Sequence, residues 1–161
     1  VETQSKRPEL VIDSVKTFAD PKFGIDIFKL ESPIAAAEVP ALDSPEAAEC
    51  QGWFNRLGQA CNVPWVMLSA GADMDAFEKV LTYAYQAGAS GYLAGRAIWW
   101  KAAQHFPDLQ KMETELNNEG VAYIKKIGQL TNECATPWFK HKQFAKGYQI
   151  TGAGQNFPAN Y

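Results

Sequence analysis

Three short apolar segments alternate along the chain with amphipathic helical patterns, and this alternation limits the fold more than any other feature. We interpret Ile25–Glu31, Trp65–Leu68 and Gly91–Ala94 as strands, because they are short, apolar and bounded by glycine, proline or capping residues. Strands that alternate with helices form a parallel sheet with right-handed crossovers. The pattern leaves two layouts open, a doubly wound sheet and part of an eight-stranded (β/α) barrel. In both, ligands bind at the carboxyl ends of the strands.

The helices between these strands have recognisable starts. Ser44 precedes Pro45 and Glu46, a sequence typical of a helix start with a capping hydroxyl, and Asp73 predicts the cap of the next helix. Further helices are predicted over about residues 8–20, 97–104 and 107–134, the last as one long helix.

Composition narrows the class of protein. With 161 residues, 47% hydrophobic and 20% charged, the chain can build a core as one domain or a large piece of one. A net charge of −3 argues against a nucleic-acid binder, and no apolar run approaches membrane length. The three cysteines, Cys50, Cys61 and Cys134, are too scattered for a disulfide framework or a zinc site. We therefore expect a soluble, cytoplasmic protein without a metal.

Lys29 is the most informative single residue. It lies inside a predicted strand, between Phe28 and Leu30, and burial there would disfavour its charged form. A neutral amine is the nucleophile that Schiff-base chemistry needs. The alternative is a structural ion pair with a carboxylate. Glu31 shares the same face of the strand and could orient the amine, transfer a proton or neutralise the charge.

Two segments at strand ends predict an anion site. Ser69-Ala70-Gly71 is a small-residue turn that leaves backbone amides free, and Gly95-Arg96 adds a guanidinium after the next strand. The alternatives are a plain turn and an arginine bound to a neighbouring carboxylate. Trp99 and Trp100 follow; both are interpreted as packing residues, with a substrate-lining role open for one of them.

Residues 135–161 differ in kind from the rest of the chain. They contain no acid, three lysines and six aromatic residues, so this arm carries +3 against −6 for the body. We predict that the arm packs its aromatics on the body or on a neighbouring subunit in a homo-oligomer; covering an anionic site is the alternative.

Taken together, three segments resemble the class I tagatose 1,6-bisphosphate aldolase family, which also includes the sulfofructose-phosphate aldolases. The segments are residues 23–33, 64–71 and 87–97, and the match in order and spacing runs along about residues 8–138. The resemblance implies a (β/α)8 barrel that cleaves a ketose phosphate through a lysine Schiff base, with no metal or other cofactor. It assigns Lys29 as the Schiff-base lysine, and the following residues as the phosphate-binding set: Ser69, Gly71, Gly95 and Arg96.

The resemblance also implies that residues 1–134 are the carboxyl-terminal half of the barrel, about strands six to eight, with 135–161 as an irregular arm. The acid/base carboxylate would lie on earlier strands, supplied by the same or a companion chain. We interpret the start at Val1 as the mark of a processed chain or a fragment. The expected partner is a small sugar phosphate, with neither nucleic acid nor membrane. The alternative functions are a non-catalytic phosphate-binding half-barrel that acts in assembly, and another barrel lyase or isomerase that uses Lys29 as a base.

Overall fold

Three parallel strands form the centre of the fold. The computed structural model describes residues 6–149, and its sheet has the order β1 (Phe28–Leu30), β2 (Trp65–Leu68), β3 (Gly91–Leu93). In the register of this sheet, Lys29 lies opposite Val66 and Val66 lies opposite Gly91. The predicted strand–helix alternation and the parallel direction are confirmed. The first strand is shorter than predicted, because only three of its residues pair with β2.

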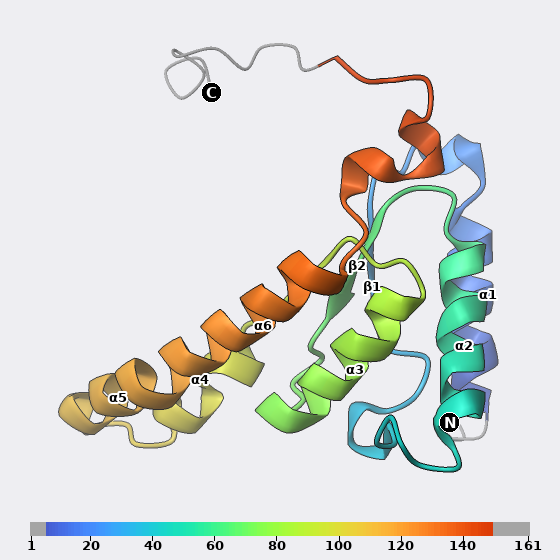
Figure 1. The fold of residues 1–161 in the computed structure, drawn as a ribbon. Helices are drawn as coiled ribbons and strands as arrows, with labels where there is room; N and C mark the ends of the chain where they lie inside the picture. Colours follow the sequence, from blue (N-terminus) through green and yellow to red (C-terminus); the bar gives the residue numbers. More distant parts are fainter. Residues whose placement is uncertain (1–5, 150–161) are drawn as a thin grey trace.

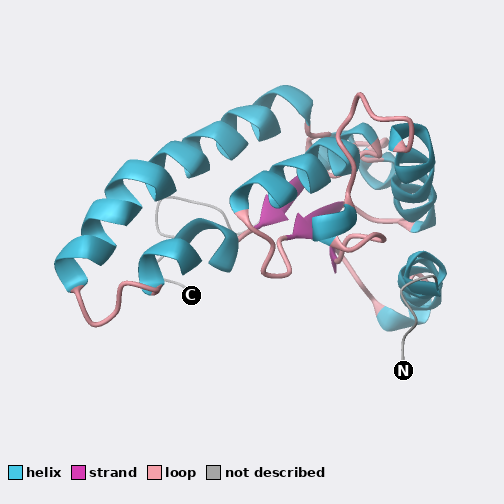
Figure 2. Cartoon of the chain, turned by 90° about the horizontal axis from the view of Figure 1, so that it is seen from below, coloured by secondary structure: helices cyan, strands magenta, loops and turns pink. Residues whose placement is uncertain are grey.

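Helices cover the sheet from one side. Helix α1 packs on α2, α2 on α3, and α3 on α6, so that they follow one another around the strands (Figures 1 and 2). The α-helices are α1 (Arg7–Phe18), α2 (Ala47–Ala60), α3 (Met74–Gln86), α4 (Arg96–Ala103), α5 (Leu109–Glu115) and α6 (Val121–Cys134). The short helical turns are η2 (Pro21–Phe23), η3 (Ala36–Glu38), η4 (Leu116–Gly120), η5 (Trp138–Lys140) and η6 (Lys142–Phe144).

The two faces of the sheet have different surroundings. On the outer face, Phe28, Trp65 and Met67 are buried against the helices. On the inner face, Lys29 is exposed and Val66 is half-buried. The expected burial of Lys29 is therefore wrong for residues 6–149, because the helices of this part of the chain lie on one side of the sheet only. The arrangement is that of an α/β fold consistent with part of a barrel, since a doubly wound sheet carries helices on both faces.

Two predicted helix features differ from the structure. Helix α2 begins at Ala47, and Ser44 contributes its carbonyl oxygen, which accepts from the Ala47 N–H at 3.1 Å. The Ser44 hydroxyl has no partner in the described part of the chain, so the predicted cap does not form. The predicted long helix is divided into α5 and α6 by a π-helical turn, η4. The cap at Asp73 is confirmed, because its carboxylate accepts from the Ala76 N–H at 2.7 Å.

The described part of the arm, residues 135–149, lies at the amino ends of the strands. The Thr136 N–H donates to the carbonyl oxygen of Ala89, just before β3, at 3.0 Å. Beyond it, four aromatic rings pack on one another with centroids 5.0–6.2 Å apart: Trp138, Phe139, Phe144 and Tyr148. This segment is at the opposite end of the sheet from the predicted anion site and does not cover it. Residues 150–161 lie outside the described part.

Candidate functional site

The carboxyl ends of the strands open into one cleft of about 450 Å³. The five residues predicted from the sequence all line it, together with Trp99 and apolar neighbours from β2 and β3. Those five residues are Lys29, Ser69, Gly71, Gly95 and Arg96. They come from three strand ends that are separate in the sequence, and the parallel sheet brings them together.

Lys29 projects from β1 onto the inner face of the sheet. Its neighbours in the strand, Phe28 and Leu30, are buried on the helix side, while Lys29 is exposed. The alternative of a structural ion pair finds no support, because no described carboxylate pairs with Lys29. Glu31 pairs instead with Arg7 of α1, at 3.0 Å between Oε2 and Nη2.

A tight turn after β2 forms one wall of the cleft. Its central residues, Ala70 and Gly71, have positive φ angles of 49° and 82°, and the Ala72 N–H closes the turn on the Ser69 carbonyl at 2.8 Å. The Ser69 N–H donates to the carbonyl of Leu93 in β3, at 3.1 Å. The predicted role of the Ser69 amide in anion binding is therefore wrong, since that amide is used by the sheet, and only the hydroxyl of Ser69 remains for a ligand.

Arg96 forms the opposite wall, as the first residue of α4. Its guanidinium lies against the turn after β2: a Cβ atom built on Gly71 would be 3.0 Å from Nη2. Gly71 thus allows the guanidinium to approach the backbone. The first amides of α4 have no partner within the helix and carry the positive end of its dipole. A guanidinium, unpaired amides and a hydroxyl around one cleft are donors suited to a phosphate group.

A contact outside the cleft holds the start of α3, which follows the turn after β2. The hydroxyl of Tyr123 in α6 donates to the carbonyl of Met74, at the start of α3, at 2.8 Å. Burial is the main cause that raises the pKa of Tyr123, so this hydroxyl remains a donor at physiological pH. The sequence pattern identified Tyr123 only as part of an apolar helix stripe, and no local signal distinguishes its hydroxyl contact.

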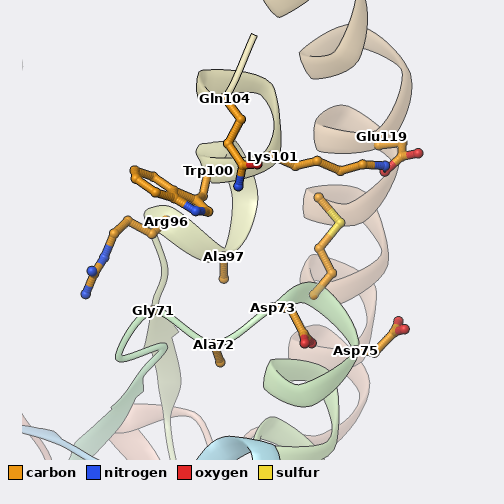
Figure 3. A pocket seen from close by; sticks show the side chains of 11 residues that line it. Gly71, Ala72, Asp73, Asp75, Arg96, Ala97, Trp100, Lys101, Gln104 and Glu119 are labelled. Carbon is orange, nitrogen blue, oxygen red and sulfur yellow. The ribbon is translucent and has the colours of Figure 1, made fainter. Parts of the chain in front are cut away.

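Behind the Gly71–Arg96 contact lies a second cavity, of about 420 Å³ (Figure 3). Across it, Lys101 of α4 reaches Glu119 of the π-helical turn and also pairs with Glu115 at 3.0 Å, while the Arg96 side chain points away from this pair. These bonds join α4 to the helices that follow it. No pattern in the sequence predicts these ion pairs, because Lys101 and Glu119 are brought together only by the fold.

Within residues 6–149, no cluster of three or more histidine, cysteine or carboxylate side chains could hold a metal ion. None of the helices in the same part of the chain is long and apolar enough to cross a membrane.

Comparison with known proteins assigns the family. A family model described as "DeoC/LacD family aldolase" matches residues 1–101. The chain belongs to the DeoC/LacD aldolase family. Curated relatives named tagatose 1,6-diphosphate aldolase include those of Lactococcus lactis subsp. lactis, 32% identical over 146 residues, and Streptococcus pneumoniae strain R6, 31% identical over 146 residues. Each of these matches covers 86% of this chain and 45% of the relative.

The relative from Staphylococcus aureus strain MSSA476, also named tagatose 1,6-diphosphate aldolase, is 29% identical over 150 residues, a match that covers 88% of this chain and 46% of the relative. The resemblance to the tagatose-bisphosphate aldolases is thereby confirmed. The chain spans less than half the length of these members of the aldolase family, which agrees with a sheet of three strands whose inner face has no cover among the described residues.

Proposed function

We propose that this chain is the carboxyl-terminal half of a (β/α)8 aldolase, with residues 135–161 as an arm beyond the barrel. The enzyme cleaves a phosphorylated ketose through a Schiff base on Lys29. The observation that carries the proposal is the common cleft, which joins the exposed amine of Lys29 to a set of anion donors at the carboxyl ends of parallel strands. Membership of the aldolase family supports it.

The chemistry follows from an amine next to a phosphate site. The neutral Nζ of Lys29 adds to the ketone carbonyl, and uptake of one proton with loss of water leaves a protonated imine; that proton is released again on hydrolysis. A base removes the proton of the hydroxyl on C4, the C3–C4 bond breaks, and its electron pair moves into the imine to give an enamine and an aldehyde. Protonation of the enamine at C3 and hydrolysis then release dihydroxyacetone phosphate and restore Lys29. No metal or other cofactor enters this sequence of steps.

We infer that the base for this cleavage comes from outside the described residues. No carboxylate is among the described residues that line the cleft, and Glu31 is engaged by Arg7. We place it on earlier strands, supplied by the same or a companion chain. Closure by those strands would also cover Lys29 and shield it from water.

The substrate class is a ketose 1-phosphate. The phosphate group would bind between the turn at Gly71 and the start of α4, where Arg96 and the unpaired amides meet. The names of the relatives favour tagatose 1,6-bisphosphate, and a sulfofructose phosphate is the other substrate that we propose. The distal end of the sugar would contact the part of the barrel outside this chain.

Borohydride trapping tests the proposal. The full-length protein is incubated with dihydroxyacetone phosphate, reduced and digested, and mass spectrometry is expected to find the adduct on Lys29. Lys29→Arg should abolish the adduct and the cleavage activity, because a guanidinium stays protonated and forms no imine. Lys16→Arg, on an exposed surface of α1, is the control and should leave both unchanged. Absence of an adduct on the unsubstituted full-length protein would overturn the proposal.

Two further variants, Lys29→Ala and Arg96→Ala, separate catalysis from simple binding. A non-catalytic phosphate-binding half-barrel would bind phosphate esters equally well after Lys29→Ala, would lose that binding after Arg96→Ala, and would form no adduct. An aldolase shows the adduct as well. A barrel enzyme using Lys29 only as a base would lose activity with Lys29→Ala without ever forming an adduct.

A further inference from the structure

Two neighbouring tryptophans in the middle of α4 line different cavities. Trp99 lines the cleft that contains Lys29, and Gly71 and Arg96 border both cavities. Trp100 lines only the second cavity (Figure 3). Trp99 is 42% exposed and is not one of the buried residues of the core. Its ring is therefore placed at the cleft without being needed to fill the interior.

The indole nitrogen of Trp99 lies over the beginning of the helix. A Cβ atom built on Gly95 would be 3.4 Å from Nε1 of Trp99, so this nitrogen lies beside the residue that precedes α4. An indole N–H can only donate a hydrogen bond. No described residue accepts one from it, and the same region holds the unpaired first amides of α4.

We propose that the indole N–H of Trp99 is a further donor to the anionic group bound by Gly71, Gly95 and Arg96. The inference rests on the proposed function, because it requires a phosphate group in this cleft. An anion at the start of α4 would lie among the guanidinium, the helix amides and the indole N–H. Hydrogen bonds to an ionised acceptor are shorter and stronger than neutral ones, so one added donor measurably increases affinity.

The absence of a side chain at Gly95 leaves the indole N–H of Trp99 accessible. A Cβ at this position would stand in van der Waals contact with Nε1 and would shield the indole N–H from a ligand at the helix start. Gly95 thus keeps two kinds of donor accessible, its own backbone amide and the indole of Trp99.

Phosphate affinity tests the proposal. In the full-length protein, the dissociation constant for inorganic phosphate is measured by ³¹P NMR line broadening. Trp99→Phe keeps an aromatic ring and removes the donor, and should weaken binding about three- to tenfold. Trp100→Phe is the matched control and should change the constant less than about twofold. Both variants should have unchanged melting temperatures without phosphate.

A second replacement isolates the single N–H group. Benzothienylalanine at position 99 has the shape of tryptophan with sulfur in place of the N–H, and it should weaken phosphate binding as Trp99→Phe does. Trapping of dihydroxyacetone, which has no phosphate, should be the same as in the unsubstituted protein. If both replacements bind phosphate normally while Arg96→Ala does not, the role of Trp99 is overturned and the proposed function stands. If the unsubstituted protein binds no phosphate, both proposals are overturned.

Discussion

The guanidinium of Arg96 can lie against the turn after β2 because residue 71 has no side chain. Gly71 has a φ of +82°, and an added Cβ would be 3.0–3.4 Å from three guanidinium atoms. A substitution at this position therefore has two effects, a strained backbone and a displaced arginine. Gly88 has a similar φ of +92° but open space around it, so it separates the two effects.

We predict that Gly71→Ala and Gly88→Ala destabilise the protein similarly, by about 1 kcal/mol, because each places a side chain at positive φ. Only Gly71→Ala should weaken phosphate binding, by about tenfold, because only there does the new Cβ displace the guanidinium of Arg96. Chemical denaturation and a phosphate titration measure the two effects. Equal phosphate affinity in both variants would contradict the assignment of Arg96 as an anion donor.

The three cysteines should differ sharply in reactivity. Burial is the main cause that raises the pKa of Cys50 to about 11 and the pKa of Cys61 to about 12. At pH 8 their thiolate fractions are therefore about 10⁻³ or less, while Cys134 is exposed. We predict that iodoacetamide labels only Cys134 in the native protein and all three after unfolding, as counted by mass spectrometry.

The same shifts predict a pH effect on stability. The folded protein holds the protons of Cys50 and Cys61 more tightly than the unfolded chain does, so the free energy of unfolding should fall as pH rises above the ordinary thiol pKa of 9.0. Cys61→Ala removes one of the two groups and should reduce this dependence on pH. Rapid native labelling of Cys61 would contradict the assigned burial.

Among the elements, α2 and the end of α3 approach each other closely at Gly58. Gly58 of α2 faces the carbonyl of Ala87 at the end of α3, and a Cβ on Gly58 would lie 2.3 Å from that oxygen. Gly52 lies on the same helix with nothing within 4 Å of its Cβ position. Both glycines lower the helix propensity of α2 equally, but only Gly58 is close to the backbone of another helix.

Gly52→Ala should therefore stabilise the protein by up to about 1 kcal/mol, because alanine is the better helix former. Gly58→Ala should destabilise it by about 1–3 kcal/mol, since α2 must move away from α3. Thermal unfolding is expected to give melting temperatures above and below that of the unsubstituted protein. A stabilising Gly58→Ala would mean that the two helices are not in contact at this point.

For the molecule as a whole, the inner face of the sheet is uncovered in the described part of the chain, whereas the aromatic rings of the arm pack on one another. Ile27 and Leu93 on the inner face are 54% and 53% exposed, and β1 and β3 each pair only with β2 in the described part of the chain. The proposed remainder of the barrel would cover both strands. The aromatic cluster instead packs within its own chain, at the amino ends of the strands.

Truncation tests the contribution of the arm. A protein ending at Ala135 loses the Thr136–Ala89 hydrogen bond and the ring contacts of the aromatic cluster, whose rings Trp138, Phe139 and Tyr148 stay 43–49% exposed. We expect a lower melting temperature, measured by calorimetry. A protein ending at Gln149 keeps the described cluster and is the matched comparison. If truncation at Ala135 leaves melting temperature, oligomeric state and activity unchanged, the arm is only a tail.

Local patterns were sufficient for the order of elements and for the residues at the strand ends. Apolar runs, helical spacing and the cap at Asp73 depend on neighbours in the sequence, so these predictions agree with the structure. The grouping of the five predicted residues in one cleft followed from a general property of parallel sheets, in which carboxyl ends meet at one edge.

Partners distant in the sequence were decided only by the tertiary structure. The amide of Ser69 is taken by Leu93, the carboxylate of Glu31 by Arg7, and the exposure of Lys29 depends on helices lying on one side of the sheet. The tertiary structure also decides which of Trp99 and Trp100 lines the cleft. Adjacent residues on a helix point about 100° apart, so the orientation of α4 on its neighbours determines which indole lines the cleft.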